Sequence, residues 1–268
     1  MNQQTDHDYL LGDDHDEMHR LQMQHQTWQP ETVDLWDRAG FRAGQTIVDV
    51  GCGPGLTTLE LAERVGPQGR VVAIDGSMRF VEISQRKTQD LDHVEVVRAD
   101  VRALDLPAAS ADAVFLRWVL CFLDDPQTAL KGIARVLKPG GRLVVMDYYN
   151  YEAFVDQPGS ESFRQVFRAV YESFSCGLDI GGQVPQMMAA CGLDVVETME
   201  IGGVASPGDR IWSWVADFQR IYLPELVKKG LLAEETRRAH LAEWREREED
   251  PAARFVAPTM LGVIGARS

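Results

Sequence analysis

The feature that most constrains this chain is a glycine-rich segment directly behind a run of apolar, β-branched residues. Residues 45–50 have the composition of a buried parallel strand, and Gly51, Gly53 and Gly55 follow at alternate positions. Residues 56–62 then carry apolar side chains at helical spacing. The glycines are therefore expected in a tight strand-to-helix turn. There the backbone takes φ values closed to other residues, and a ligand can approach without an intervening Cβ.

The spacing of these glycines separates two kinds of nucleotide-binding loop. The dinucleotide fingerprint G-x-G-x-x-G, counted from Gly51, requires glycine at position 56, which is Leu56. The order found is D-x-G-x-G-x-G, and with it the chain resembles the class I S-adenosylmethionine-dependent methyltransferases. S-adenosylmethionine carries an α-amino group and no pyrophosphate, so an acidic residue in the turn is useful. The resemblance implies a set of cofactor contacts in this loop: Asp49, Gly51, Cys52, Gly53 and Gly55.

Composition limits the class of protein and its partners. The chain has 268 residues, 45% of them hydrophobic and 25% charged, which suits one large α/β domain with an appended helical part. A net charge of −14 argues against a nucleic-acid partner. No apolar run could span a bilayer and residues 1–8 lack a secretion signal, so we expect no membrane partner and a cytoplasmic location. The four cysteines form no C-x-x-C pair, and we expect no metal site.

Residues 1–40 are expected to form an N-terminal helical cap. Acidic residues at 13–17 predict a helix start, and residues 31–39 predict a second helix. The order of residues around 9–24 resembles the cap of one small-molecule branch of the methyltransferase family. That resemblance implies contacts from Tyr9, Arg20 and Gln24 to the methionyl end of the cofactor, with Arg20 meeting its carboxylate. An amphipathic helix that only packs on the core is the alternative.

Two acidic residues follow predicted strands beside the glycine loop. Asp75 ends the strand at 70–75, where a carboxylate can accept hydrogen bonds from both ribose hydroxyls; capping of the next helix is the alternative. By the resemblance, Asp100 binds the adenine amino group and Val101 packs on the ring, with Asp105 as a rival for the first role. Further cofactor contacts are expected from the residues after Asp75, namely Gly76, Ser77 and Met78.

The exits of the fourth and fifth predicted strands supply the remaining candidates. The strand at 111–116 leads to Arg117 and Trp118 in the crevice where ligands bind in open α/β sheets, and both are predicted cofactor contacts. A surface ion pair is the alternative for Arg117. A helix at 126–136 and a Pro-Gly-Gly turn precede the fifth strand, and this segment also matches the methyltransferase family. The candidate catalytic residues follow at its exit: Asp147, Tyr148 and Tyr149.

With the resemblance, the order of predicted elements indicates a Rossmann-like, doubly wound sheet of seven strands, mostly parallel, with an antiparallel last strand. The methyltransferase domain is assigned to residues 41–268, with a helical lid insertion at about 205–250. Trp214, Phe218 and Tyr222 recur every four residues on one face of this insertion. They either line an acceptor pocket or pack the insertion onto the core.

These features predict S-adenosylmethionine-dependent methyl transfer to a small-molecule acceptor by in-line displacement, with S-adenosylhomocysteine as product and a monomer or homodimer as the active form. Alignment of the two reactants can contribute roughly 7 to 11 kcal/mol. No histidine lies at the exits of the fourth or fifth strands, so catalysis is expected to be mainly positional. The alternatives are a non-catalytic cofactor-binding or scaffold protein and an NAD(P)-dependent oxidoreductase. Leu56 argues against the second.

Overall fold

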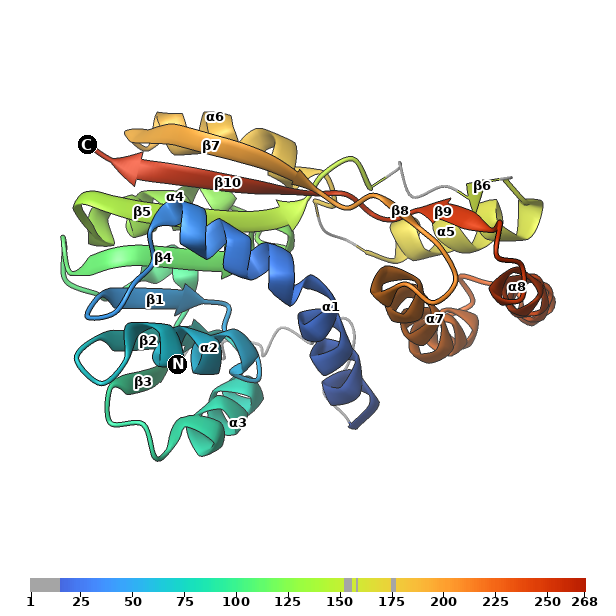
Figure 1. The fold of residues 1–268 in the computed structure, drawn as a ribbon, viewed down its shortest axis with the longest axis horizontal. Coiled ribbons are helices and arrows are strands. Elements are labelled where there is room, and N and C mark those ends of the chain that lie inside the picture. Colours follow the sequence, from blue (N-terminus) through green and yellow to red (C-terminus); the bar gives the residue numbers. More distant parts are fainter. Residues whose placement is uncertain (1–14, 152–155, 158, 175–176) are drawn as a thin grey trace, which may run out of the picture.

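The computed structural model describes residues 15–151, 156–157, 159–174 and 177–268. Its main sheet is parallel except at β10, which runs antiparallel to both of its neighbours (Figure 1). The predicted doubly wound sheet with an antiparallel last strand is therefore confirmed. In spatial order the strands are β3 (Val94–Arg98), β2 (Arg70–Asp75), β1 (Thr46–Val50), β4 (Ala111–Arg117), β5 (Leu137–Tyr148), β10 (Met260–Arg267) and β7 (Leu193–Ile201).

Helices cover both faces of this sheet because the strand side chains alternate between two apolar clusters. Phe115 and Val144 pack in the cluster of one face, and Val114 and Leu143 pack in the cluster of the other. The first cluster includes residues of α1 (His15–Ala39) and α2 (Leu56–Val65), with α3 (Met78–Thr88) beside α2. The second includes residues of α4 (Pro126–Val136) and α6 (Val184–Ala190).

The N-terminal region forms one helix where the sequence predicted two. α1 continues from His15 to Ala39 with Pro30 inside it. A proline in a helix interior removes one backbone hydrogen bond and costs about 3 kcal/mol. The burial of Trp28, Leu35 and Trp36 along this helix offsets that cost, since each is at most 1% exposed. The two-helix prediction was wrong because tertiary packing outweighs the local preference of one residue.

The fifth strand also begins earlier than predicted. β5 starts at Leu137, and its pairing with β4 steps from Ala111–Leu137 to Ala113–Arg142. The Pro-Gly-Gly turn is thus an irregularity inside β5. Gly140 has the positive φ of +76° that the predicted turn requires.

A second group of elements lies beyond the carboxyl ends of the parallel strands (Figure 1). It contains α5 (Glu161–Ser173), α7 (Arg210–Lys228), α8 (Glu234–Glu248) and a small sheet of β6 (Asp156–Gln157), β9 (Arg254–Val256) and β8 (Val204–Ala205). α7 and α8 are the helices expected between the last two strands. Trp214 joins this group to α1 through an edge-to-face contact with Trp28, their ring centroids 5.4 Å apart. No helix in the described part of the chain is long and apolar enough to cross a membrane.

Candidate functional site

One cavity of about 950 Å³ connects the glycine loop with the second group of helices. We call its first part the loop end. Among the predicted residues, the loop end is lined by Gly51, Cys52, Gly53, Asp75, Gly76, Ser77, Asp100, Val101, Arg117 and Trp118. We call its second part the helical end. The helical end is lined by Tyr151, Phe163, Val166, Phe167, Val170, Phe174, Trp214, Val215, Phe218, Gln219 and His240.

The glycine loop is closely packed at two positions and open at the one between them. Gly51, Gly53 and Gly55 have φ values of +67°, +52° and +81°, a region that favours glycine. A Cβ on Gly51 would lie 2.3 Å from a methyl carbon of Val119, and one on Gly55 would lie 2.6 Å from Oγ of Ser84. A Cβ on Gly53 would meet no protein atom within 4 Å. The backbone at Gly53 is therefore a bare surface that faces the cavity.

Asp49 does not line the cavity. It is 1% exposed, and its Oδ2 accepts hydrogen bonds from the hydroxyls of Thr57 and Thr58 at 3.0 and 2.7 Å. Burial raises the pKa of Asp49 to about 6. Its position ties the end of β1 to the first turn of α2. Gly55 is also outside the lining residues, and so is Met78, which is 46% exposed.

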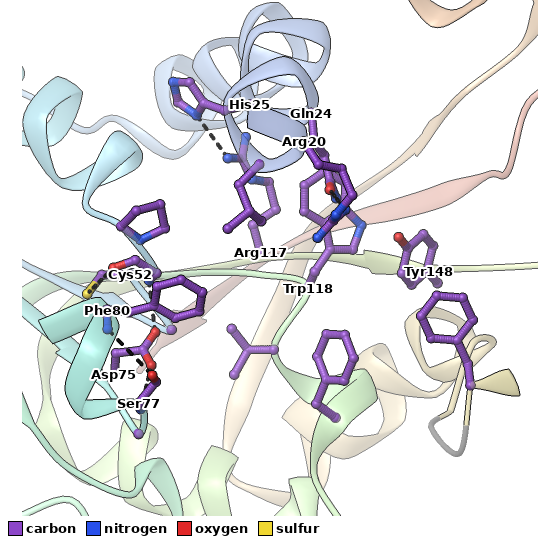
Figure 2. Close-up of a pocket in the computed structure, with 18 of the residues that line it drawn as sticks. Arg20, Gln24, His25, Cys52, Asp75, Ser77, Phe80, Arg117, Trp118 and Tyr148 are labelled. Carbon is purple, nitrogen blue, oxygen red and sulfur yellow. Dashed lines mark hydrogen bonds between the residues drawn. The ribbon is translucent and has the colours of Figure 1, made fainter. Parts of the chain in front are cut away.

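Asp75 stands at the carboxyl tip of β2 and holds the glycine loop. Its Oδ2 accepts from the backbone N–H of Gly53 and its Oδ1 from that of Ser77, both at 2.8 Å (Figure 2). Burial raises the pKa of this carboxyl. The helix cap is supplied by Ser77, whose Oγ accepts from Phe80 N at 3.4 Å. The capping alternative for Asp75 is therefore wrong, and its carboxylate lies in the wall of the cavity.

Asp100 and Val101 lie just beyond β3, and both line the loop end. Asp100 accepts from the backbone and the side chain of Arg102, with an Oδ2–Nη2 distance of 2.7 Å. Val101 is 7% exposed and contributes an apolar wall. Asp105, the rival for the role of Asp100, is not among the residues that line the cavity.

Arg117 is a cation in the cavity wall that forms no hydrogen bond to a carboxylate of the described residues. Its Nη2 donates to His25 Nδ1 at 3.0 Å (Figure 2). Its Nη1 donates to Thr32 Oγ1 at 2.9 Å. Because a guanidinium only donates, Nδ1 of His25 accepts, and Nε2 carries the proton toward Glu60 at 3.1 Å. Removal from bulk water lowers the pKa of Arg117 to about 10. Among the described residues no carboxylate forms an ion pair with Arg117, so the alternative of a surface ion pair does not apply.

Arg20 and Gln24 also line the cavity, from the first turns of α1, but the charge of Arg20 is already paired. Its Nε and Nη2 donate to the two carboxylate oxygens of Glu17, each at 2.6 Å, and its Nη1 donates to Gln24 at 2.6 Å. Arg20 and Glu17 are both nearly fully buried. Of Arg117 and Arg20, only Arg20 is hydrogen-bonded to a carboxylate, whereas Asp49 and Glu60 act on the charge of Arg117 without a hydrogen bond to it. Tyr9, the third residue predicted in the cap, lies outside the described residues.

Only one of the three candidate catalytic residues lines the cavity. Tyr148 does, and burial holds the pKa of its phenol well above the usual value, so it stays protonated. Asp147 is fully buried outside the cavity wall and accepts from the backbone N–H groups of Leu120 and Tyr148, each at 2.9 Å. Burial raises the pKa of Asp147 to about 6. Tyr149 is also absent from the lining residues.

Trp118 links the two ends of the cavity. It has a φ of +53°, which is strained for a residue with a bulky side chain. The guanidinium of Arg117 lies 5.0 Å from the centroid of its indole, and the ring of Tyr148 lies 6.0 Å away on the other side. Ring contacts continue from Tyr148 to Tyr151 at 5.3 Å and on to Phe167 at 5.7 Å. An aromatic wall therefore runs from the loop end into the helical end.

The helical end contains a buried polar pair that the sequence did not reveal. Nε2 of His240 lies 2.9 Å from Oε1 of Gln219, and the two side chains are 2% and 4% exposed. Burial lowers the pKa of His240 to about 4, so the imidazole is neutral near pH 7. Phe218 lines the cavity with Trp214, whereas Tyr222 packs in the cluster of α5 and α7. The residues of the aromatic stripe therefore divide between the wall of the cavity and a packed cluster, and an acceptor-binding role for the first two stays a prediction.

The fold and the cavity define a class I methyltransferase architecture. Residues 48–145 match the model of a family described as a methyltransferase domain, so this part of the chain is similar to that family. The resemblance inferred from the D-x-G-x-G-x-G loop is thus confirmed.

The chain is 34% identical over 205 residues, 74% of its length, to an uncharacterised 37.1 kDa protein of transposon TN4556 from Streptomyces fradiae. It is 31% identical over 167 residues, 61% of its length, to a demethylmenaquinone methyltransferase of Lactococcus lactis. It covers 59% and 62% of these relatives.

Solved structures share the fold at lower identity. The [4+2]-cyclase SpnF aligns with a TM-score of 0.60 and 18% identity over 90% of this chain and 81% of that one. A geranyl diphosphate C-methyltransferase from Streptomyces coelicolor, solved with Mg²⁺, geranyl-S-thiolodiphosphate and S-adenosylhomocysteine, aligns with a TM-score of 0.59 and 17% identity. That alignment covers 97% of this chain and 84% of that one. At such identities the likeness concerns the fold alone.

Proposed function

We propose that this protein is an S-adenosylmethionine-dependent methyltransferase whose acceptor is a small molecule. The observation that carries the proposal is the continuous cavity that joins the glycine loop to the second group of helices. Its loop end has the features of a nucleotide-type site, and its helical end offers a second, adjoining space. Ligand pockets typically measure about 300 to 1,000 Å³. At about 950 Å³, the cavity is at the upper end of that range, as expected where a donor and an acceptor bind side by side.

The residues of the loop end fit S-adenosylmethionine. The bare backbone at Gly53 leaves room for the ligand to lie against the loop, and Asp75 at the tip of β2 suits the ribose hydroxyls. Asp100 and Val101 suit the adenine, as the family resemblance implies. The bound cofactor would supply an electrophilic methyl group on a sulfonium.

We assign the carboxylate of the cofactor to Arg117 and not to Arg20. A carboxylate gains most from a cation that has no other anionic partner in a partly desolvated site. Arg117 comes closer to that condition than Arg20, since its two hydrogen bonds go to a hydroxyl and a ring nitrogen, and Asp49 and Glu60 act on its charge without a hydrogen bond to it. Arg20 is already bound through two nitrogens to Glu17. In this arrangement Arg20 keeps α1 in place and shapes the cavity wall.

Catalysis in this proposal is mainly positional. Tyr148 is the candidate that reaches the junction of the two ends, and its protonated phenol can donate a hydrogen bond that orients the acceptor. Asp147 is separated from the cavity and already accepts several backbone hydrogen bonds, so we assign it a structural role at the end of β5. A cytoplasmic location, the domain limits 1–40 and 41–268, and a monomer or homodimer stay predictions.

Two measurements test the proposal. Calorimetric titration of the full chain with S-adenosylhomocysteine and with NADH should give binding of the first only; the reverse result would favour an oxidoreductase. Incubation with methyl-labelled S-adenosylmethionine and a pooled library of hydroxylated aromatic and isoprenoid compounds should then transfer label to a small molecule. Cofactor binding without any transfer would favour the scaffold alternative, or a use of the fold for other chemistry, as in the cyclase.

A further inference from the structure

A residue that lines the helical end of the cavity, His240, has a hydrogen-bonding atom that no part of the described chain satisfies. Nδ1 of His240 is buried and has no hydrogen-bond partner among the described residues. His240 itself is a lining residue of the cavity. A buried polar atom without a partner is unfavourable by roughly 1 to 3 kcal/mol and is uncommon in folded proteins. A ligand that supplies the missing hydrogen bond would remove that penalty.

The bond to Gln219 fixes what the ligand must supply. Oε1 of Gln219 can only accept, so Nε2 of His240 carries the single proton of the neutral imidazole. Nδ1 then presents a lone pair and no proton. The complementary group on a ligand is a hydrogen-bond donor, which is a hydroxyl or a neutral N–H.

The walls around His240 indicate the rest of the ligand. The described residues that line the helical end include aromatic, aliphatic and amide side chains and no lysine, arginine, aspartate or glutamate. An ionised ligand group at His240 would be desolvated with no charged side chain in this lining to pair with it, since Glu243 and Arg247 act on His240 from outside the lining. A diphosphate or a carboxylate therefore does not suit this end, whereas flat apolar groups suit Phe163, Phe167 and Phe218.

His240 also stands away from the donor. It belongs to α8, which lies farther from β1 and its glycine loop than α7 does (Figure 1). The aromatic wall from Trp118 through Tyr148 and Tyr151 to Phe167 spans the interval. A group bound at His240 is thus a recognition group and not the atom that is methylated.

We propose that the acceptor is an uncharged, elongated and largely apolar molecule whose far end carries a hydroxyl or neutral N–H group that donates to Nδ1 of His240. This inference rests on the proposed function only in naming that molecule the methyl acceptor. Gln219 acts as a positioning residue, because it fixes the proton on Nε2.

The test uses two biphenyls of similar shape, 4-phenylphenol and 4-fluorobiphenyl, of which only the first carries a donor. Equilibrium dialysis against the full chain, with and without saturating S-adenosylhomocysteine, should give about tenfold tighter binding of 4-phenylphenol. Equal affinities, or no binding of either compound, would overturn the proposal. Titration of S-adenosylhomocysteine on the same preparation is a separate readout, so a failure of the cofactor site is distinguished from a failure of the helical end.

Two substitutions at position 240 separate recognition from structural support. His240→Gln can keep a hydrogen bond to Gln219 but has no atom at the Nδ1 position, so the tenfold preference should disappear. His240→Asn places an amide oxygen near the Nδ1 position and should retain part of the preference, although the bond to Gln219 is lost. His93→Gln makes the same change at a histidine that does not line this cavity and should keep the full preference. If His240→Gln kept it as well, His240 would serve only to join α8 to α7.

Discussion

Gly53→Ala isolates the contact between the cofactor and the glycine loop. The added methyl group would meet no protein atom within 4 Å, so it does not disturb the packing of the loop itself. It does impose a side chain on a backbone with φ of +52°, at a cost of about 1 to 2 kcal/mol in folding stability. In the complex, the same methyl group would occupy space that the ligand needs.

The expected loss of affinity follows from that steric conflict. Inserting a methyl group into a filled site typically costs about 1 to 3 kcal/mol, which corresponds to roughly 5- to 150-fold weaker binding. Calorimetric titration with S-adenosylhomocysteine measures this loss, and thermal unfolding measures the strain separately. The chain provides a matched control in Gly192→Ala. Gly192 has φ of +74°, is also free of protein atoms within 4 Å of an added Cβ, and lies after α6 outside the cavity.

Both variants should lose similar stability, but only Gly53→Ala should lose affinity. If Gly53→Ala bound S-adenosylhomocysteine as tightly as the wild type while both variants were destabilised, the ligand would not lie against Gly53. The assignment of the loop end to the cofactor would then be wrong. If Gly192→Ala lost affinity to the same extent, strain and not contact would account for the result.

Further predictions concern Arg117, His240 and the lining of the helical end. In calorimetry, Arg117→Met should weaken the binding of S-adenosylhomocysteine by about tenfold or more. The binding of 5′-methylthioadenosine, which has no carboxylate, should be unaffected. Equal losses of affinity for the two compounds would contradict our assignment of the carboxylate. The folded-state pKa of His240, about 4, is below its unfolded value near 6.5, so its contribution to stability is present above pH 6.5 and is lost as the pH falls toward 4. Between pH 7.5 and 4, the free energy of unfolding measured with urea should therefore fall by up to about 3 kcal/mol more for the wild type than for His240→Phe. The same pH dependence in both proteins would show that the imidazole is not desolvated. Geranyl diphosphate should fail to displace 4-phenylphenol in competition dialysis, because the described lining of the helical end has no lysine or arginine; displacement at equal concentration would contradict that reading.

The loop end could be predicted from the sequence because its residues stand next to recognisable strand ends. Gly51 directly follows β1, Gly53 stands two residues later and Asp75 is the last residue of β2. Parallel strands bring their carboxyl ends to one edge of the sheet. This reasoning does not predict the direction in which a side chain points. Asp49 precedes the glycines in the motif, yet its side chain turns to the hydroxyls of α2 and not to the cavity.

The alternation of side chains along a strand limits which residues at the exit of the fifth strand can face one pocket. Successive side chains of a strand point to opposite sides, so Asp147, Tyr148 and Tyr149 could not all face one pocket. Tyr148 lines the cavity, and Asp147 is directed to backbone N–H groups. His240 had no comparable signal. It lies in a charged helix far from the strand motifs in sequence, and only the packing of α8 against α5 and α7 brings it to the cavity.

The two ends of the cavity are not independent, because α1 takes part in both. At the loop end α1 supplies Thr32 and His25, the hydrogen-bond partners that hold the Arg117 guanidinium in the cavity wall. At the helical end the same helix supports α7 through the packing of Trp28 on Trp214, a residue that lines the cavity. A shift of α1 that moves Arg117 must therefore also move the surface on which α7 rests. If a carboxylate binds at Arg117 as proposed and thereby fixes α1, we expect it to restrict the positions open to the helical wall of the cavity as well.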